Sequence, residues 1–305
     1  MFRYRISVCT PTFNRAHTLG RVYESLYRQG VSDFEWLIID DGSSDGTDEL
    51  VQSWILNRPS FSIRYYKQRN GGKMRAVNRG LQMADGELFM ILDSDDYLTD
   101  DALEKIFQWE SNIHHMRDRF AGLVGLKTRD DGTILGSCFQ GYPVDASMKN
   151  ALKQGVRGDH AEIWYTDVFR RHPFPEIEGE KFISEGVTWI EICEEEERIL
   201  RWINEPIMVC EYLPDGYSMA ALRLGVENPK GVLLNIKKKI HYLKPGKRSK
   251  LKMWHKYFII GRNNCYSHTK IRKDLEIACV DYVLLLVLHY VLQSVRSVKR
   301  LWKKD

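Results

Sequence analysis

Short apolar runs alternate with amphipathic segments along the first 130 residues of the chain. Four of the apolar runs are predicted to be buried strands: 5–10, 35–40, 62–67 and 87–92. Between them, apolar residues recur at helical spacing, as Leu19, Val22, Tyr23 and Leu26 do. Strand and helix in strict succession predict βαβ units, and hence an α/β fold with a mostly parallel sheet covered by helices on both faces.

Polar and glycine-rich residues directly follow each of the four predicted strands. These loops are Pro11–Arg15, Asp40–Gly46, Asn70–Lys73 and Asp93–Asp96. Ligands of parallel α/β sheets bind beyond the carboxyl ends of the strands, and all four loops fall at such ends. We therefore expect the four loops to form one site.

Asp93 and Asp95 stand two residues apart at the end of the strand 87–92. In extended backbone, side chains two residues apart point to the same side, so both carboxylates can face one cation. Mg2+ and Mn2+ bind one or two carboxylates and complete their coordination with water and substrate phosphates. The pair thus predicts a site for a metal ion and a diphosphate. The alternative is that Asp95 and Asp96 only cap a helix that begins near Asp100.

The second and third loops offer groups that suit a nucleotide. Asp40 and Asp41 can accept hydrogen bonds from a base or a ribose, and Gly42 permits a tight turn beside them. Lys73 follows two glycines and can reach phosphate oxygens, whereas Arg75 is as readily interpreted as a solvated surface residue.

Other site classes fit the sequence less well. The segment 42–46 matches the G-x-S-x-G of a hydrolase, with His160 or His172 as partner, but no oxyanion loop accompanies it and the aspartates stay unexplained. No GxGxxG follows the first strand, and no P-loop occurs. The six cysteines are at least 14 residues apart, which excludes CxxC zinc or redox spacing.

The motifs resemble a known family in order and spacing. The segments SVCTPTFNRAHTLGRVYESLYRQ, FEWLIIDDGSSDGTDELV and NGGKMRAVNRGLQMADGELFMILDSDDYL are similar to the nucleotide-sugar domain of family 2 glycosyltransferases with the GT-A fold. The resemblance covers residues 4 to 110 strongly and 170 to 220 more loosely. It implies a metal-dependent, inverting transfer of a sugar from a nucleotide-diphosphate donor, with a UDP-sugar as first choice.

The resemblance also implies roles for residues of the four loops. Pro11 and Thr12 would line the base pocket, Asp41 would read the base, Asp93 would lie near ribose and metal, and Asp95 would coordinate Mn2+ or Mg2+. The remaining residues assigned to nucleotide binding are Asn14, Arg15, Asp40, Asn70 and Lys73.

Members of this family usually place a Glu-Asp pair before a helix in the second half. Here Gly186 stands where the aspartate is expected. Glu185 is our first choice for the base that deprotonates the acceptor, and Glu180 is the second. The alternative is that Glu185 only favours the N-terminus of a helix over 187–192.

The charge of the chain is unevenly distributed. Residues 237–305 carry 18 Lys and Arg against 4 Asp and Glu, whereas the first 236 residues carry 27 against 37. The apolar stretch 279–292 is shorter than a membrane span and leads into basic residues, which predicts a helix on an anionic membrane surface. An ordinary core helix is the alternative, and no nucleic-acid recognition motif accompanies the charge.

These observations predict a GT-A domain over 1–225, with a nucleotide half (1–110) and an acceptor half (111–225), and a helical basic extension over 226–305. We expect a saccharide or lipid-linked acceptor of cell-envelope polysaccharide assembly. The lack of a signal peptide predicts a cytoplasmic protein, peripheral to the inner face of the membrane. The alternatives are an inactive nucleotide-binding partner of another transferase and a sugar-nucleotide pyrophosphorylase.

Overall fold

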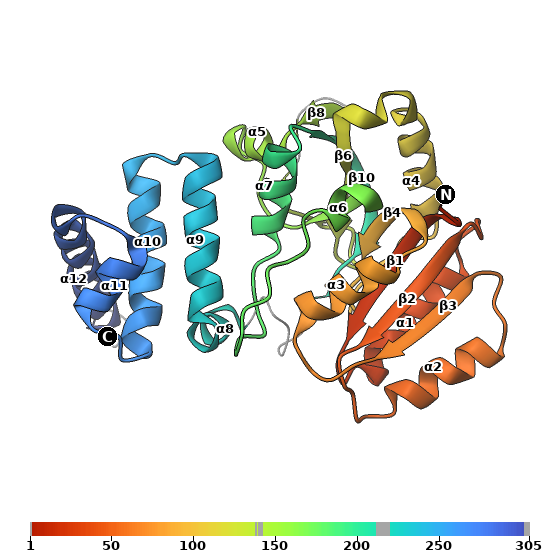
Figure 1. Cartoon of the computed structure of the whole chain (residues 1–305), viewed down its shortest axis with the longest axis horizontal. Coiled ribbons are helices and arrows are strands. Elements are labelled where there is room, and N and C mark those ends of the chain that lie inside the picture. The colour runs from red at the N-terminus through yellow and green to blue at the C-terminus, as the bar shows by residue number, and fades with distance from the viewer. Residues whose placement is uncertain (1, 138, 140–142, 212–219, 302–305) are drawn as a thin grey trace. The chain divides into compact units, whose positions relative to one another are not determined.

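The computed structural model describes residues 2–137, 139, 143–211 and 220–301 (Figure 1). It divides the chain into two compact units. The first unit comprises residues 1–176 and 185–219, and the second comprises residues 177–184 and 220–305. The segment 177–184, which the sequence suggested was part of the catalytic domain, thus packs with the C-terminal helices.

The first half of the first unit is the predicted βαβ array. Its strands are parallel in the order β3-β2-β1-β4, and the helices α1, α2 and α3 connect them (Figure 1). The bounds are β1 (Tyr4–Thr12), α1 (Ala16–Tyr27), β2 (Phe34–Asp40), α2 (Thr47–Leu56), β3 (Ser62–Lys67), α3 (Lys73–Met83) and β4 (Gly86–Ile91). The prediction of an α/β fold with a central sheet flanked by helices is confirmed.

The second half extends the same 10-stranded sheet but mixes strand directions. The central strand β9 (His160–Tyr165) runs antiparallel to both β4 and β6 (Phe120–Thr128), and β6 runs parallel to β10 (Ile199–Val209). Three short strands pair antiparallel at this end: β5 (Tyr97–Leu98), β7 (Ile134–Leu135) and β8 (Val144–Ala146). Only the strands β1 to β4 are therefore paired exclusively in parallel with one another.

Short helices accompany this half: α4 (Ala102–Ser111), a 3-10 helix (His114–Arg119), α5 (Met148–Lys153), α6 (Thr166–Arg170) and α7 (Gly186–Glu195). Aromatic packing fixes α7 on the sheet. Trp189 of α7 stacks on Trp164 of β9 with ring centroids 4.7 Å apart, and Phe169 and Phe174 meet Trp189 edge-on. Such buried aromatic pairs add to the stabilisation that their buried area already gives.

Gly80 lets α3 approach β1 closely. A Cβ at this position would lie 2.3 Å from the Sγ of Cys9, well inside van der Waals contact. The close approach matters because α3 begins at Lys73, and Cys9 belongs to the strand that leads into the first loop.

The second unit consists of five helices within the described residues: α8 (Ala221–Glu227), α9 (Pro229–Leu243), α10 (Lys247–Asn263), α11 (His268–Leu275) and α12 (Cys279–Leu301). Trp254, Tyr257 and Phe258 of α10 form a core with Tyr282 and Leu285 of α12, among others. Of the helices that the structure describes, none is by itself long and apolar enough to span a membrane, but α11 and residues 279–294, bent by 117°, pass that test together.

Candidate active site

Hydrogen bonds join the first two predicted loops. Thr12 pairs with Asp40 in the parallel register of β1 and β2, so both loops leave the sheet at one level. Asn14 then donates its backbone N–H to Ser43 Oγ at 2.8 Å and accepts the Ser44 N–H on its Oδ1 at 2.9 Å. Pro11 and Thr12 are buried at the end of β1, and Thr12 Oγ1 is a buried hydroxyl without a hydrogen-bond partner among the described residues.

Asp41 ties the second loop to the third. Its carboxylate accepts backbone N–H groups of Gly71 at 2.9 Å and Gly72 at 2.7 Å, and Asn70 Nδ2 donates to the Asp41 carbonyl at 3.0 Å. Gly42 has φ +89°, and a Cβ there would meet the Asn70 backbone nitrogen at 3.2 Å. The loops approach so closely that glycine is required at this turn.

Asp40 and Asp41, which are expected to contact the base or the ribose, are both engaged inside the protein. Asp40 is 0% exposed, and its carboxylate accepts the Ser43 N–H at 2.7 Å and the Tyr65 hydroxyl at 2.6 Å. Asp41 is 3% exposed and holds the glycine loop. Both carboxylates thus hold the loops of this edge in place, and their direct contact with a nucleotide stays a prediction.

The DSDD segment forms a turn rather than the extended backbone that the sequence predicts, because the Asp96 N–H donates to the Asp93 carbonyl at 3.1 Å. Asp93 and Asp95 are partly exposed, whereas Ser94 and Asp96 between and after them are buried. Burial and the nearby charge of Asp93 raise the pKa of Asp95, so the two carboxylates lie close enough to repel. A divalent cation bound by both carboxylates would remove this repulsion. Carboxylate oxygens are ligands that suit Mn2+ or Mg2+.

Asp95 and Asp96 do not cap a helix, which was the alternative interpretation of this segment. Helix α4 begins at Ala102, and Asp101 holds its N-cap position. The carboxylate of Asp96 instead accepts from Cys210 Sγ at 3.0 Å and lies 3.6 Å from Lys127 Nζ. The charge of Arg15 acts on Asp95, which places the first loop at the same edge.

Lys73 joins the predicted metal ligand to the predicted base. Its Nζ lies 2.7 Å from the carboxylate of Asp93 and 2.8 Å from that of Glu185, and the side chain is only 13% exposed. Burial alone would favour the neutral amine, but the charges of Asp93 and Glu185 outweigh it and raise the pKa of Lys73. A buried ammonium between two carboxylates is therefore the centre of the site.

Glu185 and Glu180, the two candidates for the base, have different surroundings. Glu185 stands at the N-cap position of α7 but makes no side-chain cap hydrogen bond, because its carboxylate turns to Lys73. Glu180 belongs to the second unit, where its two carboxylate oxygens accept the N–H groups of Lys230 and Gly231 at 2.8 and 2.7 Å. These contacts favour Glu185 over Glu180 as the base, which stays a prediction.

The sequence interpretation missed three residues at this edge: Lys127 of β6, Glu162 of β9 and Cys210 after β10. Burial raises the pKa of Asp96 to about 6 although Lys127 opposes the shift. A single charged residue inside an apolar strand was the signal available, since 120–128 holds one lysine and 160–165 one glutamate. The pairing of β6, β9 and β10 was needed to bring them to this edge.

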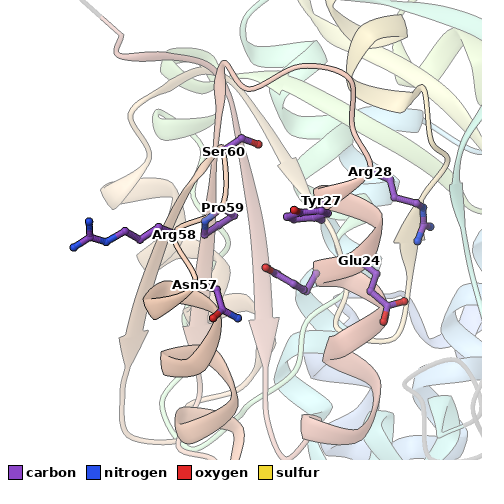
Figure 2. A pocket seen from close by; sticks show the side chains of 8 residues that line it. Glu24, Tyr27, Arg28, Asn57, Arg58, Pro59 and Ser60 are labelled. Carbon is purple, nitrogen blue, oxygen red and sulfur yellow. The ribbon is translucent and has the colours of Figure 1, made fainter.

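A separate surface groove of about 560 Å3 lies in the same unit. Tyr23 and Tyr27 of α1 line it together with Pro59 and its neighbours after α2 (Figure 2). None of the predicted site residues lines this groove.

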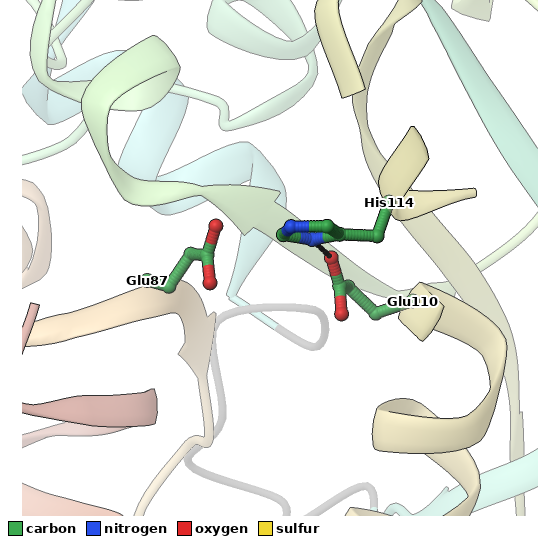
Figure 3. Close-up of side chains that lie close together, drawn as sticks. All are labelled: Glu87, Glu110 and His114. Carbon is green, nitrogen blue, oxygen red and sulfur yellow. Dashed lines mark hydrogen bonds and ion pairs between the residues drawn. The ribbon is translucent and has the colours of Figure 1, made fainter. Parts of the chain in front are cut away.

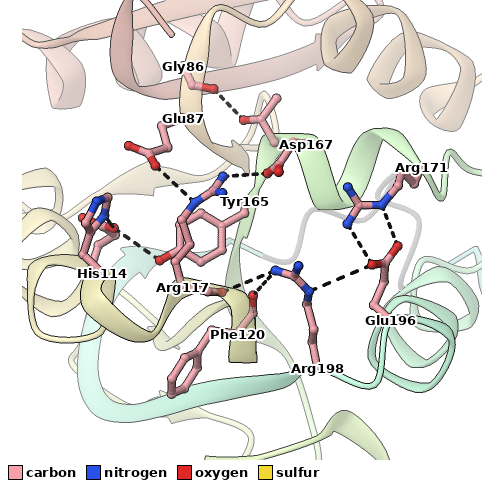
Figure 4. A network of polar contacts seen from close by, with 12 residues as sticks. Gly86, Glu87, His114, Arg117, Phe120, Tyr165, Asp167, Arg171, Glu196 and Arg198 are labelled. Carbon is pink, nitrogen blue, oxygen red and sulfur yellow. Dashed lines mark hydrogen bonds and ion pairs between the residues drawn. The ribbon is translucent and has the colours of Figure 1, made fainter. Parts of the chain in front are cut away.

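Glu87, Glu110 and His114 form a second cluster with metal-ligand chemistry, their ligand atoms lying within 4.8 Å of one another (Figure 3). Here, however, Arg117 lies 3.2 Å from Glu87, and Arg5 lies 3.4 Å from Glu110. The arginines supply the positive charge, so the cluster is part of an ion-pair network. That network continues through Arg198 to Glu196 (Figure 4).

Comparison with known proteins identifies relatives of the chain. Residues 7–112 match the family model described as glycosyl transferase family 2. A GalNAc(5)-diNAcBac-PP-undecaprenol beta-1,3-glucosyltransferase of Campylobacter jejuni is 27% identical and covers 63% of this chain. A hyaluronan synthase of Pasteurella multocida is 37% identical over 52% of this chain. The chain spans 60% and 16% of the lengths of these two relatives.

Solved structures share the fold at low sequence identity. S. aureus TarS 1-349 in complex with UDP aligns with a TM-score of 0.54 and 18% identity, over 92% of this chain and 80% of that one. The mannosyltransferase PcManGT from Pyrobaculum calidifontis, in complex with GDP-Man and Mn2+, aligns with a TM-score of 0.54 and 18% identity, over 99% and 81%. The likeness shows the GT-A fold.

Proposed function

We propose that this chain, whose residues 7–112 match glycosyl transferase family 2, transfers a sugar from a nucleotide-diphosphate donor to a saccharide or lipid-linked saccharide acceptor in cell-envelope polysaccharide assembly. The observation that carries the proposal is the bridge from Asp93 through Lys73 to Glu185. It joins a group suited to the donor side of a transfer with a group suited to the acceptor side.

On the donor side, Asp93 and Asp95 would hold Mn2+ or Mg2+, and Lys73 would bind the diphosphate. The metal supplies positive charge to the leaving diphosphate as its negative charge develops. The ammonium of Lys73 is already charged and desolvated in the folded protein, so it needs little reorganisation to hydrogen-bond a phosphate oxygen.

On the acceptor side, Glu185 would remove the proton of the attacking hydroxyl. The acceptor oxygen forms a bond to the anomeric carbon while the bond from that carbon to the diphosphate oxygen breaks. The electron pair leaves with the nucleoside diphosphate, and the proton stays on the Glu185 carboxylate. A single in-line displacement of this kind inverts the anomeric configuration.

The donor class rests on relatives. Crystal structures of S. aureus TarS contain UDP or UDP-GlcNAc, and a structure of PcManGT is of its complex with GDP-Man and Mn2+. We favour a UDP-sugar for this chain, and the lipid-linked acceptor follows the C. jejuni relative, whose name specifies an undecaprenol-linked substrate.

We also propose that α12 holds the enzyme peripherally on an anionic membrane. One side of α12 contributes Tyr282 and Leu285 to the core of the second unit. Its other side exposes Val280, Val283, Val287, Tyr290 and Val291, each by 53% or more. An apolar face on a strongly basic segment suits the interface of a bilayer with anionic lipids.

Calorimetric titration with UDP, GDP and dTDP, with and without Mn2+, tests the donor site. We expect Mn2+-dependent binding of one nucleotide, lost in Asp95→Asn because one oxygen ligand and one charge of the metal site are removed. Asp118→Asn, at an exposed aspartate of the 3-10 helix, is the matched control and should bind normally. If the wild-type protein binds none of the three nucleotides, an inactive partner of another transferase becomes the better interpretation.

A further inference from the structure

We propose that Glu162 is an acceptor-binding residue whose carboxyl hydrogen-bonds the acceptor sugar beside the hydroxyl that Glu185 deprotonates. This inference rests on the proposed function and adds a contact at the same site. It comes from the placement of Glu162 on the central strand β9 and from the hydrogen-bonding capacity that the fold leaves to it.

The packing of α7 on β9 brings Glu162 and Glu185 together. Glu162 and Trp164 are two residues apart on β9 and therefore point to the same face of the sheet. Glu185 and Trp189 are four residues apart, and Glu185 already has helical dihedral angles, so they share one face of α7. Trp189 stacks on Trp164 at 4.7 Å, and the charge of Glu185 acts on Glu162, so the two glutamates lie near each other.

The strand register brings Glu162 level with the end of β4. Met90 of β4 pairs with Ile163, and Val124 of β6 pairs with Glu162 itself. Glu162 is therefore level with the end of β4, from which Asp93 continues. Glu162 thus lies on the strand that pairs with β4, after which the predicted metal ligands follow.

Glu162 differs from Asp93, Asp96 and Glu185 in its contacts. Asp93 and Glu185 pair with Lys73, and Asp96 with Lys127. The carboxyl of Glu162 accepts only its own backbone N–H and makes no other hydrogen bond or ion pair with the residues that the structure describes. A recessed, partly exposed carboxyl with free capacity at a transfer site is suited to bind a ligand.

The charge state of Glu162 also suits a sugar hydroxyl. Burial raises the pKa of Glu162 to about 8, Lys127 of β6 opposes the shift, and Glu185 of α7 and Asp159 before β9 reinforce it. The ionisable residue that follows β4 is Asp93, which Lys73 neutralises. At neutral pH the group is then largely a carboxylic acid that donates one hydrogen bond and accepts others, whereas Glu185 is ion-paired with Lys73.

The test compares Glu162→Gln with Glu162→Ala, using the p-nitrophenyl glycoside that the wild-type enzyme accepts best in a panel of such glycosides. The amide of glutamine reproduces the neutral donor and acceptor, so its acceptor KM at pH 7 should stay within about threefold of wild type. Alanine should raise the acceptor KM by about tenfold or more, the cost of one lost hydrogen bond of this kind. Glu104→Gln, at an exposed glutamate of α4, is the matched control.

Two further readouts separate binding of the acceptor from a structural role. Hydrolysis of the donor without acceptor should keep its kcat/KM in both Glu162 variants. Above pH 8 the wild-type acceptor KM should rise as Glu162 ionises, and that of Glu162→Gln should not.

Each contrary outcome has a definite meaning. Donor hydrolysis that falls with transfer in Glu162→Ala, or equal acceptor KM values in alanine variant and wild type, would overturn the role of Glu162 and leave the proposed function intact. Absence of donor hydrolysis and of transfer in the wild-type enzyme would instead overturn the proposed function itself.

Discussion

At the scale of single residues, Lys73 controls the electrostatics of the site. One ammonium lies between two carboxylates and offsets the repulsion between them at this edge of the sheet. A bound diphosphate would compete for the same ammonium, because phosphate oxygens form strong charge-assisted hydrogen bonds. Donor binding should therefore weaken the hold of Lys73 on Glu185 and leave that carboxylate available as a base.

Glu185→Gln tests the assignment of the base. Glutamine keeps the size and most hydrogen bonds of the side chain but cannot take up a proton, so transfer should fall by about 10²–10⁴-fold in kcat. Donor affinity, measured by calorimetry, should change little, because the metal ligands and Lys73 remain. Glu180→Gln is the comparison, and turnover that survives in Glu185→Gln but is lost in Glu180→Gln would move the base to Glu180.

Sequence reasoning predicted some of these residues better than others. The placement of the DSDD segment and of Lys73 at one edge could be predicted because both follow strands of the parallel array, whereas the turn at Asp93–Asp96 could not. Lys127 and Glu162 could not, since a lone charge in an apolar strand acquires meaning only when neighbouring strands are known. Asp40 and Asp41 were predicted as contacts for a ligand, and only the three-dimensional structure shows that Ser43, Tyr65 and the glycine loop engage them.

At the scale of elements, α7 connects packing with chemistry. Its Trp189 belongs to the aromatic core, and its first turn carries the predicted base. Its other end is held by Glu196, which accepts two hydrogen bonds from Arg171 at 2.7 and 2.8 Å (Figure 4). Glu196 also lies 2.8 Å from His172. The contacts with Arg171, and with His172 beside it, lower the pKa of Glu196 to about 2.

This pKa shift predicts a stability difference that depends on pH. A carboxylate with a lowered pKa stabilises the fold above its unfolded pKa and loses that contribution as the pH falls toward its folded pKa. Glu196→Gln should therefore lower Tm by about 2–4 °C at pH 7, equivalent to about 1 kcal/mol after allowing for the exposure of Arg171. The difference should shrink between pH 4.5 and pH 2 in scanning calorimetry.

A control variant makes the result interpretable. Glu104→Gln removes an exposed glutamate for which the structure gives no ion pair among the described residues, so it should leave Tm unchanged at both pH values. A Tm difference for Glu196→Gln that stays constant from pH 7 to pH 2 would show that the ion pair is not its cause.

Strand prediction at this scale depended on context. The strand predicted over 62–67 coincides with β3, and those over 5–10, 35–40 and 87–92 lie within a residue or two of β1, β2 and β4. Their regular alternation with helices made the parallel order predictable. No sequence pattern predicts that β9 lies antiparallel between β4 and β6, because that pairing depends on long-range contacts.

At the scale of the whole molecule, charge and apolar surface coincide in the second unit. Its described residues expose the apolar face of α12 within the basic region 237–305. Solvation of such a face is unfavourable, and a membrane surface would cover it while attracting the lysines and arginines nearby. The opposite side of α12 fits the alternative of an ordinary core helix, because it contributes Tyr282 and Leu285 to the core.

Val287→Glu tests the membrane proposal. A carboxylate in the middle of the exposed face of α12 should weaken cosedimentation with vesicles of phosphatidylglycerol and phosphatidylcholine by about tenfold, since apolar burial is lost and like charges meet. Leu222→Glu, at an equally exposed apolar residue of α8, is the matched control and should bind as wild type does. Equal binding of both variants, or no binding by the wild-type protein, would contradict the proposal.

The discontinuous second unit has a consequence for how the protein is made. Residues 177–184 leave the ribosome before α7 and β10, and the helices with which they pack follow later still. Domains fold as units during synthesis. The first unit can therefore complete its sheet before the helices that pack with residues 177–184 have been synthesised. Only when α9 emerges do the N–H groups of Lys230 and Gly231 reach the carboxylate of Glu180. The order of translation thus makes the helical unit the last part to form. It forms around residues 177–184, which were synthesised before the first unit was complete.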